Sequence, residues 1–318
     1  MDRSFKRRPV YIFSILNLMK KLFKKIFILF IIVFVCDRVG AFFLENIFYK
    51  QKHGDDAATI YLLDSTKADI LVFGSSRASH HYVSDIFEKK LNTVFFNGGR
   101  DKMGLHYSFA ILEVLLKRHK PKVILFDLMP TSLFKINNEE EIKKYNDIQT
   151  NTLLPFANAH PGIYNTIDEL NKIEKYKSKI CKTYNYNSLF GTIIQNAYTN
   201  LGHTSIKGYE PVYGSIDKKS YSKPLFPFPA TDNAIDTTAI EILNRCVNIC
   251  VQNDVKPIIL ISPFYFEIPV YKNLEIALKE IAKNTTVYDF SRDSFYVKNN
   301  NLFYDEWHLN HTGASLFF

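Results

Sequence analysis

Cysteine is scarce in this chain, with four among 318 residues, and their positions exclude a disulfide framework. Cys36 lies in an apolar run, and Cys181 stands alone. Cys246 and Cys250 are four residues apart on a stretch with helical spacing, so we expect them to pack as small apolar side chains. No cysteines and histidines have the spacing of a zinc site. The sequence therefore predicts no cofactor and no metal.

Excess positive charge is absent from most of the chain. The formal net charge is +8, but residues 1–25 hold eight basic residues against one acid, which leaves about +1 for all the rest. A nucleic-acid-binding protein needs its positive charge on the folded body, so no nucleic-acid partner is expected. Internal repeats and low-complexity tracts are also absent, which excludes a repeat architecture.

Only one long apolar segment is present, at residues 26–44, and it has about the length of a transmembrane helix. The basic N-terminus, 1–25, is predicted to stay in the cytoplasm, which places the remainder in the periplasm or outside the cell. Asp37 and Arg38 interrupt the segment, and we expect them near the outer interface or paired within the helix. A cleaved signal peptide is the alternative, although no small-x-small cleavage site follows.

After a polar linker at residues 45–67, apolar runs of strand length alternate with segments of helical periodicity. Such alternation predicts an α/β fold, with one domain at 68–318 of the flavodoxin-like, three-layer kind. Its ligands should bind at the carboxyl ends of the strands. The predicted strands of its parallel five-stranded sheet are 69–73, 93–96, 122–126, 256–261 and 286–290, and the predicted helices are 83–91, 105–116, 240–251 and 274–281.

The alternation breaks at residues 131–231, which are rich in Tyr, Asn, Lys and Pro. A bare loop of this length is rare in a compact domain, so the segment predicts an insertion with short helices over the active face. Its tyrosines, including Tyr184 and Tyr186, either stack on sugar rings or cover the edges of the core, and the second interpretation is favoured. The insertion also contains the proline-rich run 224–229.

Two short motifs carry the chemistry. Gly74-Ser75-Ser76-Arg77 directly follows an apolar strand, which turns through the glycine into a helix start and exposes a serine hydroxyl. Near the C-terminus, Asp305 and His308 are three residues apart, so the carboxylate can bind one ring nitrogen while the other faces Ser76. Together they offer a nucleophile, a base and an orienting acid. Gly74-Ser75-Ser76-Arg77 alone would indicate a helix cap or an anion nest.

Both motifs resemble those of the SGNH/GDSL hydrolase family, over residues 68–130 and 236–318. The resemblance implies a flavodoxin-like sheet with Ser76 as nucleophile, His308 as base and Asp305 as its partner. A helix start at Asn310-His311-Thr312-Gly313 follows, as it does in the family. Each motif alone is a weak indication of the family. The two together, in the family's order and each in the expected strand context, are a moderately specific one.

The chain departs from the family at its oxyanion-hole donors. One donor is expected to be the backbone N–H of Ser76. Lys102 stands where the family has a glycine, so either its N–H or that of Gly99 or Gly104 is expected to donate. Thr131 stands where the family has an asparagine, and its shorter hydroxyl predicts a weaker hole. Losing one such donor typically lowers the rate about a hundredfold.

Other polar residues near the motifs have more than one interpretation. Arg77 is a candidate clamp for a substrate carboxylate or phosphate, although a solvated or sheet-edge arginine is equally consistent. His80 and His81 are expected to be structural. His311 follows His308 by three residues, but no further residue has metal-ligand spacing.

The layout is similar to that of membrane-anchored proteins that O-acetylate alginate or assist D-alanylation of teichoic acid. This resemblance implies a serine esterase or O-acyltransferase acting on an acylated glycan of the envelope or a secreted polysaccharide. A membrane-bound acyl donor protein would be its partner. The alternative is a catalytically impaired scaffold or glycan-binding subunit of a polysaccharide modification machine. A secreted lipid esterase is a further alternative, which the polar insertion fits poorly.

Overall fold

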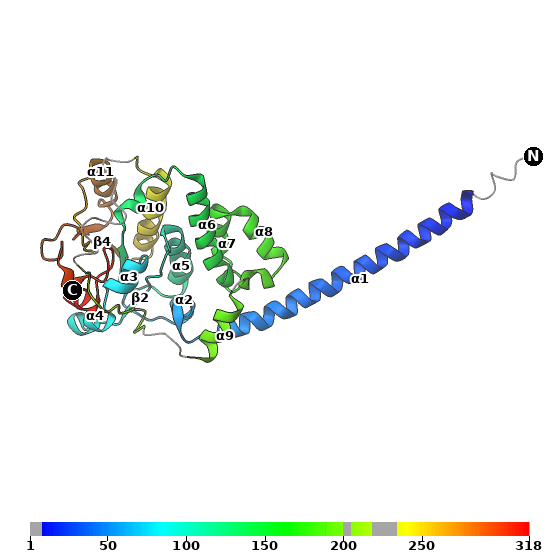
Figure 1. Ribbon diagram of the computed structural model, residues 1–318, viewed down its shortest axis with the longest axis horizontal. Helices are drawn as coiled ribbons and strands as arrows, with labels where there is room; N and C mark the ends of the chain where they lie inside the picture. The colour runs from blue at the N-terminus through cyan, green and yellow to red at the C-terminus, as the bar shows by residue number, and fades with distance from the viewer. Residues whose placement is uncertain (1–7, 188, 200–204, 218–233, 318) are drawn as a thin grey trace, which may run out of the picture.

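A computed structural model describes residues 8–187, 189–199, 205–217 and 234–317, and its body is built on one parallel sheet (Figure 1). The basic residues at 1–7 and the proline-rich run 224–229 lie outside the described residues. The strand order is β2-β1-β3-β4-β5, which is the flavodoxin-like order, so the predicted fold class and sheet are confirmed. The strands are β1 (Ile70–Phe73), β2 (Phe95–Asn97), β3 (Val123–Asp127), β4 (Lys256–Ile261) and β5 (Thr286–Asp289).

Helices cover both faces of this sheet. Alternate residues of a strand point to opposite faces, so Leu71 and Phe73 enter one core cluster while Val72 enters another. The first cluster lies under α2 (Gly54–Asp64), α5 (Leu105–Arg118), α10 (Thr237–Gln252) and α11 (Lys272–Ile281). The second lies under α3 (Ser76–His81) and α4 (Ser84–Leu91), with α12 (His311–Leu316) packed against α3. Burying one such apolar side chain contributes roughly 1.5–3 kcal/mol.

The insertion folds into short helices that extend the first core cluster outward from α5. They are α6 (Glu139–Leu153), α7 (Ile163–Leu170), α8 (Lys172–Ile180) and α9 (Phe190–Tyr198), with single turns at η1 (Pro130–Leu133), η2 (Leu154–Phe156) and η3 (Thr183–Tyr186). Asn138 caps α6 by accepting from the N–H groups of Glu140 and Glu141. Of the described part of the insertion, only some segments lie over the active face. Tyr145 of α6 and the stretch 205–217 reach that face, whereas α7 packs on α5 and α9 on α1.

Helix α1 (Arg8–Phe48) projects from the body as a long rod (Figure 1). Within the described chain, one helix is long and apolar enough to cross a membrane, and it covers Ile15–Phe48. Its C-terminal part is docked, because Phe48 is fully buried and its ring centroid lies 5.2 Å from that of Phe156. The linker expected at 45–67 is therefore the end of α1 followed by a short turn and α2.

The two charges inside the apolar segment are held by the insertion. The Asp37 carboxylate accepts from the backbone N–H groups of Lys182 and Thr183, each at 2.9 Å, and from the Thr183 hydroxyl at 2.7 Å. Arg38 donates to the Ile180 carbonyl at 3.1 Å and lies 3.4 Å from Asp37. Both charges thus have partners on the body, which removes much of the cost of placing them in an apolar helix.

Candidate active site

The turn that presents Ser76 requires glycine at its start. Strand β1 ends at Phe73, and a Cβ on Gly74 would lie 2.9 Å from the Asp127 carbonyl oxygen and 2.8 Å from the Ala78 side chain. Only a residue without a side chain lets β1 turn this close to β3. Ser76 is then the first residue of α3, where backbone N–H groups lack partners within the helix.

Three side chains that are distant in sequence form one hydrogen-bonded line. His308 Nε2 lies 2.8 Å from Ser76 Oγ, and His308 Nδ1 lies 2.9 Å from Asp305 Oδ2. The structure therefore brings together the serine, histidine and aspartate that the sequence paired. An ionised carboxylate only accepts, so Nδ1 carries the proton and Nε2 is left to accept the serine proton.

The Asp305 carboxylate is held in its ionised form. Burial by itself raises its pKa, but hydrogen bonds from the His308 ring and from the N–H groups of Trp307 and His308 lower it below the ordinary value. Both N–H groups donate to Asp305 Oδ1 at 2.8 Å. The tight turn at 305–308 thus orients the imidazole and stabilises the positive charge it would gain.

Arg77 does not face a ligand. Its side chain is 3% exposed and donates to the Trp307 carbonyl at 3.1 Å and to the Ser262 carbonyl at 2.6 Å. Its Nε lies 3.6 Å from Asp127 Oδ1, and the guanidinium stacks on the Phe264 ring. The expected clamp on a substrate anion is therefore not available, because every direction around this group is filled by protein. Arg77 instead ties the nucleophile helix to β4 and to the loop of His308.

His81 performs a similar task from within the core. Its Nε2 accepts from the Leu309 N–H at 3.0 Å, so its Nδ1 carries the proton and donates to Ser262 Oγ at 2.9 Å. Burial, and then the nearby charge of Arg77, lowers the pKa of His81 well below its ordinary value. The neutral ring of His81 thus holds Leu309, the residue after His308, against α3. This contact is consistent with the structural role expected for His81.

The candidate oxyanion donors are not equivalent. The Gly99 N–H donates to Asn97 Oδ1 at 2.9 Å, so it is already engaged. Lys102 has a φ of 63° and lines a cavity of about 210 Å³ together with Ser75. Thr131 lines a neighbouring cavity instead, while Ser132 lines the cavity beside Ser75. Gly104 also lines it, and a Cβ there would overlap the Tyr145 hydroxyl, so the tyrosine would have to move.

No family model matches the sequence, and a search of curated proteins finds no match.

Proposed function

We propose that the chain is a serine esterase or O-acyltransferase of the SGNH type. The observation that carries the proposal is the hydrogen-bonded line of Ser76, His308 and Asp305, whose two contacts of 2.8 Å and 2.9 Å join segments more than 200 residues apart. The line lies at the carboxyl end of β1, the edge where ligands bind in this kind of sheet. Buried groups such as Arg77 hold it in place, as a preorganised catalytic site requires.

Each residue of the line has one task in the reaction. Ser76 Oγ attacks the acyl carbon while His308 Nε2 takes its proton, and Asp305 balances the imidazolium charge. The oxyanion is bound by the N–H of Ser76 and by that of Lys102. The departing alcohol takes the proton from His308, which leaves an acyl group on Ser76. Water or an acceptor hydroxyl then takes that acyl group in the reverse order of steps.

The acyl group would enter the cavity lined by Ser75, the chain neighbour of Ser76, and by Lys102, and this cavity suits a small acyl group. Its volume of about 210 Å³ lies below that of sites that hold drug-sized molecules, roughly 300–1,000 Å³. By the resemblance in layout, the substrate is an acylated glycan of the cell envelope, with a membrane-bound acyl donor in the case of transfer. A lipid esterase would need room for a long chain, so we expect hydrolysis of short but not long p-nitrophenyl esters.

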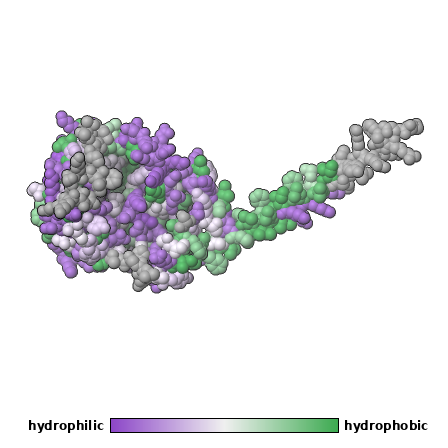
Figure 2. Space-filling model, in the orientation of Figure 1, coloured by the Kyte–Doolittle hydropathy of each residue, from purple (hydrophilic) through white to green (hydrophobic). Residues whose placement is uncertain are grey.

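We also propose that α1 anchors the body to a membrane, with the basic end in the cytoplasm. The apolar residues 26–44 span roughly 28 Å at 1.5 Å per residue, which is close to the thickness of a bilayer core. Apolar side chains continue from α1 onto the adjacent edge of the body (Figure 2). More than half of the side chain is exposed at Ile173, Tyr176 and Ile180 of α8 and at Phe190 of α9, and α9 packs on α1. These faces suit the lipid surface next to the anchor.

A fluorophosphonate probe tests the catalytic proposal. The full chain in detergent should be labelled, Ser76→Ala should not, and Ser315→Ala, in α12 with its Oγ on the His311 carbonyl, should be labelled normally. Circular dichroism checks that Ser76→Ala is folded. Labelling that survives in Ser76→Ala contradicts the assignment of the nucleophile.

A glycan-binding scaffold is the second candidate function, and the oxyanion donors are the observation that favours it. The Gly99 N–H already donates to Asn97, and Thr131 lines another cavity. The proposed oxyanion hole therefore depends on few donors. A scaffold predicts that folded wild-type protein resists the probe yet binds the acylated polysaccharide. Ester turnover by the wild type and not by Ser76→Ala would exclude it.

A further inference from the structure

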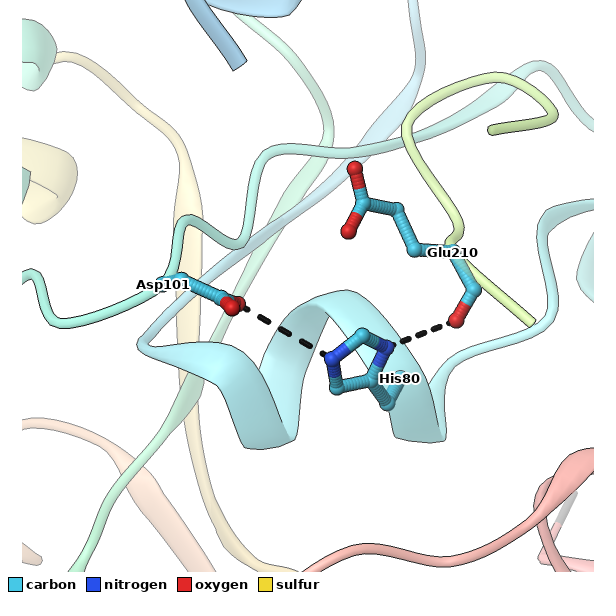
Figure 3. Close-up of side chains that lie close together, drawn as sticks. All are labelled: His80, Asp101 and Glu210. Carbon is cyan, nitrogen blue, oxygen red and sulfur yellow. Dashed lines mark hydrogen bonds and ion pairs between the residues drawn. The ribbon is translucent and has the colours of Figure 1, made fainter. Parts of the chain in front are cut away.

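A second group of polar side chains lies beside the nucleophile helix, formed by His80, Asp101 and Glu210 (Figure 3). His80 belongs to α3, Asp101 follows β2, and Glu210 comes from the stretch 205–217 that ends the described insertion. One ligand atom from each lies within 4.8 Å of the others. The three residues are far apart in sequence, so no spacing signal reveals the group.

The tautomer of His80 leaves Nε2 without a proton, and this nitrogen faces the space between the three side chains. His80 Nδ1 lies 2.7 Å from the backbone carbonyl oxygen of Glu210, and a carbonyl can only accept, so Nδ1 carries a proton. In the neutral ring, Nε2 then presents a lone pair toward Asp101 Oδ1, 3.9 Å away. Two acceptors facing each other at this distance are matched by a proton on Nε2 or by a cation between them. Metal-binding histidines are oriented in this way, by a carbonyl on the other nitrogen.

Ser79 holds the Asp101 carboxylate and the backbone of Glu210. Ser79 Oγ lies 3.1 Å from Asp101 Oδ1, and the backbone N–H of Glu210 donates to the Ser79 carbonyl at 2.9 Å. Within the described ranges, no side chain donates a hydrogen bond to the Glu210 carboxylate. The Glu210 carboxylate therefore has no side-chain donor among these residues to balance its negative charge.

The nearest arginine is committed elsewhere. Arg100 shares a cavity with Glu210, but its guanidinium donates to Asp56 at 2.6 Å and to the Thr59 hydroxyl at 2.9 Å. It also lies 4.0 Å from Asp55. The positive charge of Arg100 is thus paired with the carboxylates of α2. It does not balance the carboxylates around His80, which still favour a cation.

We propose that His80 Nε2 and the carboxylates of Asp101 and Glu210 bind one divalent cation of the zinc class. One imidazole and two carboxylates are a ligand set for Zn²⁺, and three protein ligands leave a coordination position open. In tetrahedral geometry, ligands about 2.1 Å from a shared ion lie about 3.4 Å apart, so the group closes on the ion with side-chain movements of about 1–1.5 Å.

The ion would lie next to the reacting serine. His80 follows Ser76 by four residues on α3, and its ring centroid lies 5.3 Å from that of His308. The open position would bind an oxygen of the substrate or a water beside the nucleophile. Binding of the ion does not depend on ester chemistry, so this proposal stands or falls separately from the proposed function.

Titration of the metal-stripped full chain in detergent tests the site, with Zn²⁺ followed by calorimetry and Co²⁺ by visible absorption. We expect one ion per chain. Each of His80→Gln, Asp101→Asn and Glu210→Gln should weaken binding at least about tenfold. His160→Gln is the matched control, because His160 also faces a carboxylate, Asp64 at 3.1 Å, and it should bind the ion as the wild type does. Thermal unfolding without metal checks that each variant is folded.

Three outcomes overturn the proposal. The first is the absence of binding by folded wild type up to about 1 mM Zn²⁺, where any affinity is negligible. The second is equal binding by wild type and all three ligand variants. The third is loss of binding in His308→Gln but not in His80→Gln. That result would place the ion on the hydrogen-bonded line of Ser76, His308 and Asp305.

Discussion

At the scale of single residues, the site depends on which atom carries each proton. Asp305 fixes the His308 tautomer through contacts of 2.9 Å and 3.0 Å to Nδ1. An asparagine would present an amide at the same place and favour the wrong tautomer. We expect Asp305→Asn to lower the rate of ester turnover by about 10³–10⁴-fold with little change in KM. A loss of less than about tenfold would show that Asp305 does not orient the base.

Asp305 should also contribute to stability in a pH-dependent way. Its folded-state pKa lies below the ordinary 3.8, because hydrogen bonds from His308 and the backbone outweigh the effect of burial. The contribution is therefore present above pH 3.8 and is lost as the pH falls through the folded-state pKa. Urea denaturation should show the difference in unfolding free energy between wild type and Asp305→Asn shrinking below about pH 5. A constant difference down to about pH 3 contradicts this.

Arg77 is expected to hold the hydrogen-bonded line of Ser76, His308 and Asp305 in place through its buried contacts. Replacing it by methionine leaves the Asp127 carboxylate buried without its cation, which typically costs about 3–5 kcal/mol. Arg245→Met is the matched control, since Arg245 binds Glu169 through two contacts at a half-exposed surface, and we expect a loss of under about 1 kcal/mol. Equal losses of unfolding free energy in the two variants would contradict a buried anchoring role for Arg77.

At the scale of elements, the junction between α1 and the insertion decides how the rod is attached. The Asp37 carboxylate accepts hydrogen bonds from the backbone N–H groups of Lys182 and Thr183, so η3 is held to α1 at this point. We expect Asp37→Ala to raise hydrogen exchange at both amides at least about tenfold, as expected for the loss of hydrogen bonds to a charged group. Asn46→Ala is the control, because its side chain bonds only within α1. Unchanged exchange in Asp37→Ala would show that Phe48 and its neighbours hold the junction alone.

At the scale of the whole molecule, the charge asymmetry predicts the sidedness of the protein. Most of the net +8 precedes the apolar segment, whereas the body is nearly neutral. A protease added to spheroplasts, whose cytoplasmic membrane is intact, should therefore digest the body and leave an N-terminal tag protected, while both are digested after lysis. Protection of the body in spheroplasts, or release of the full chain into the soluble fraction, would contradict the proposed anchor.

The sequence by itself determined the architecture of the body. Alternating apolar runs and helical periodicities are local features, because each strand or helix buries a face set by its own repeat. The predicted strands therefore match β1 to β5 within two residues at each end. The pairing of Ser76 with Asp305 and His308 was also expected, from the two motifs and the family that they resemble, and the structure places the three side chains within hydrogen-bond distance.

Only the tertiary structure decided which polar groups are free. Gly99 has its N–H engaged and Arg77 is enclosed, although both looked available in the sequence. The partner of Asp37 lies about 145 residues away on η3, and the group around His80 joins three separate segments. Whether a donor or a charge faces solvent, protein or a ligand depends on long-range packing of loops. No local repeat in the chain encodes that packing, since the free energy of a buried polar group is set by whichever segment covers it.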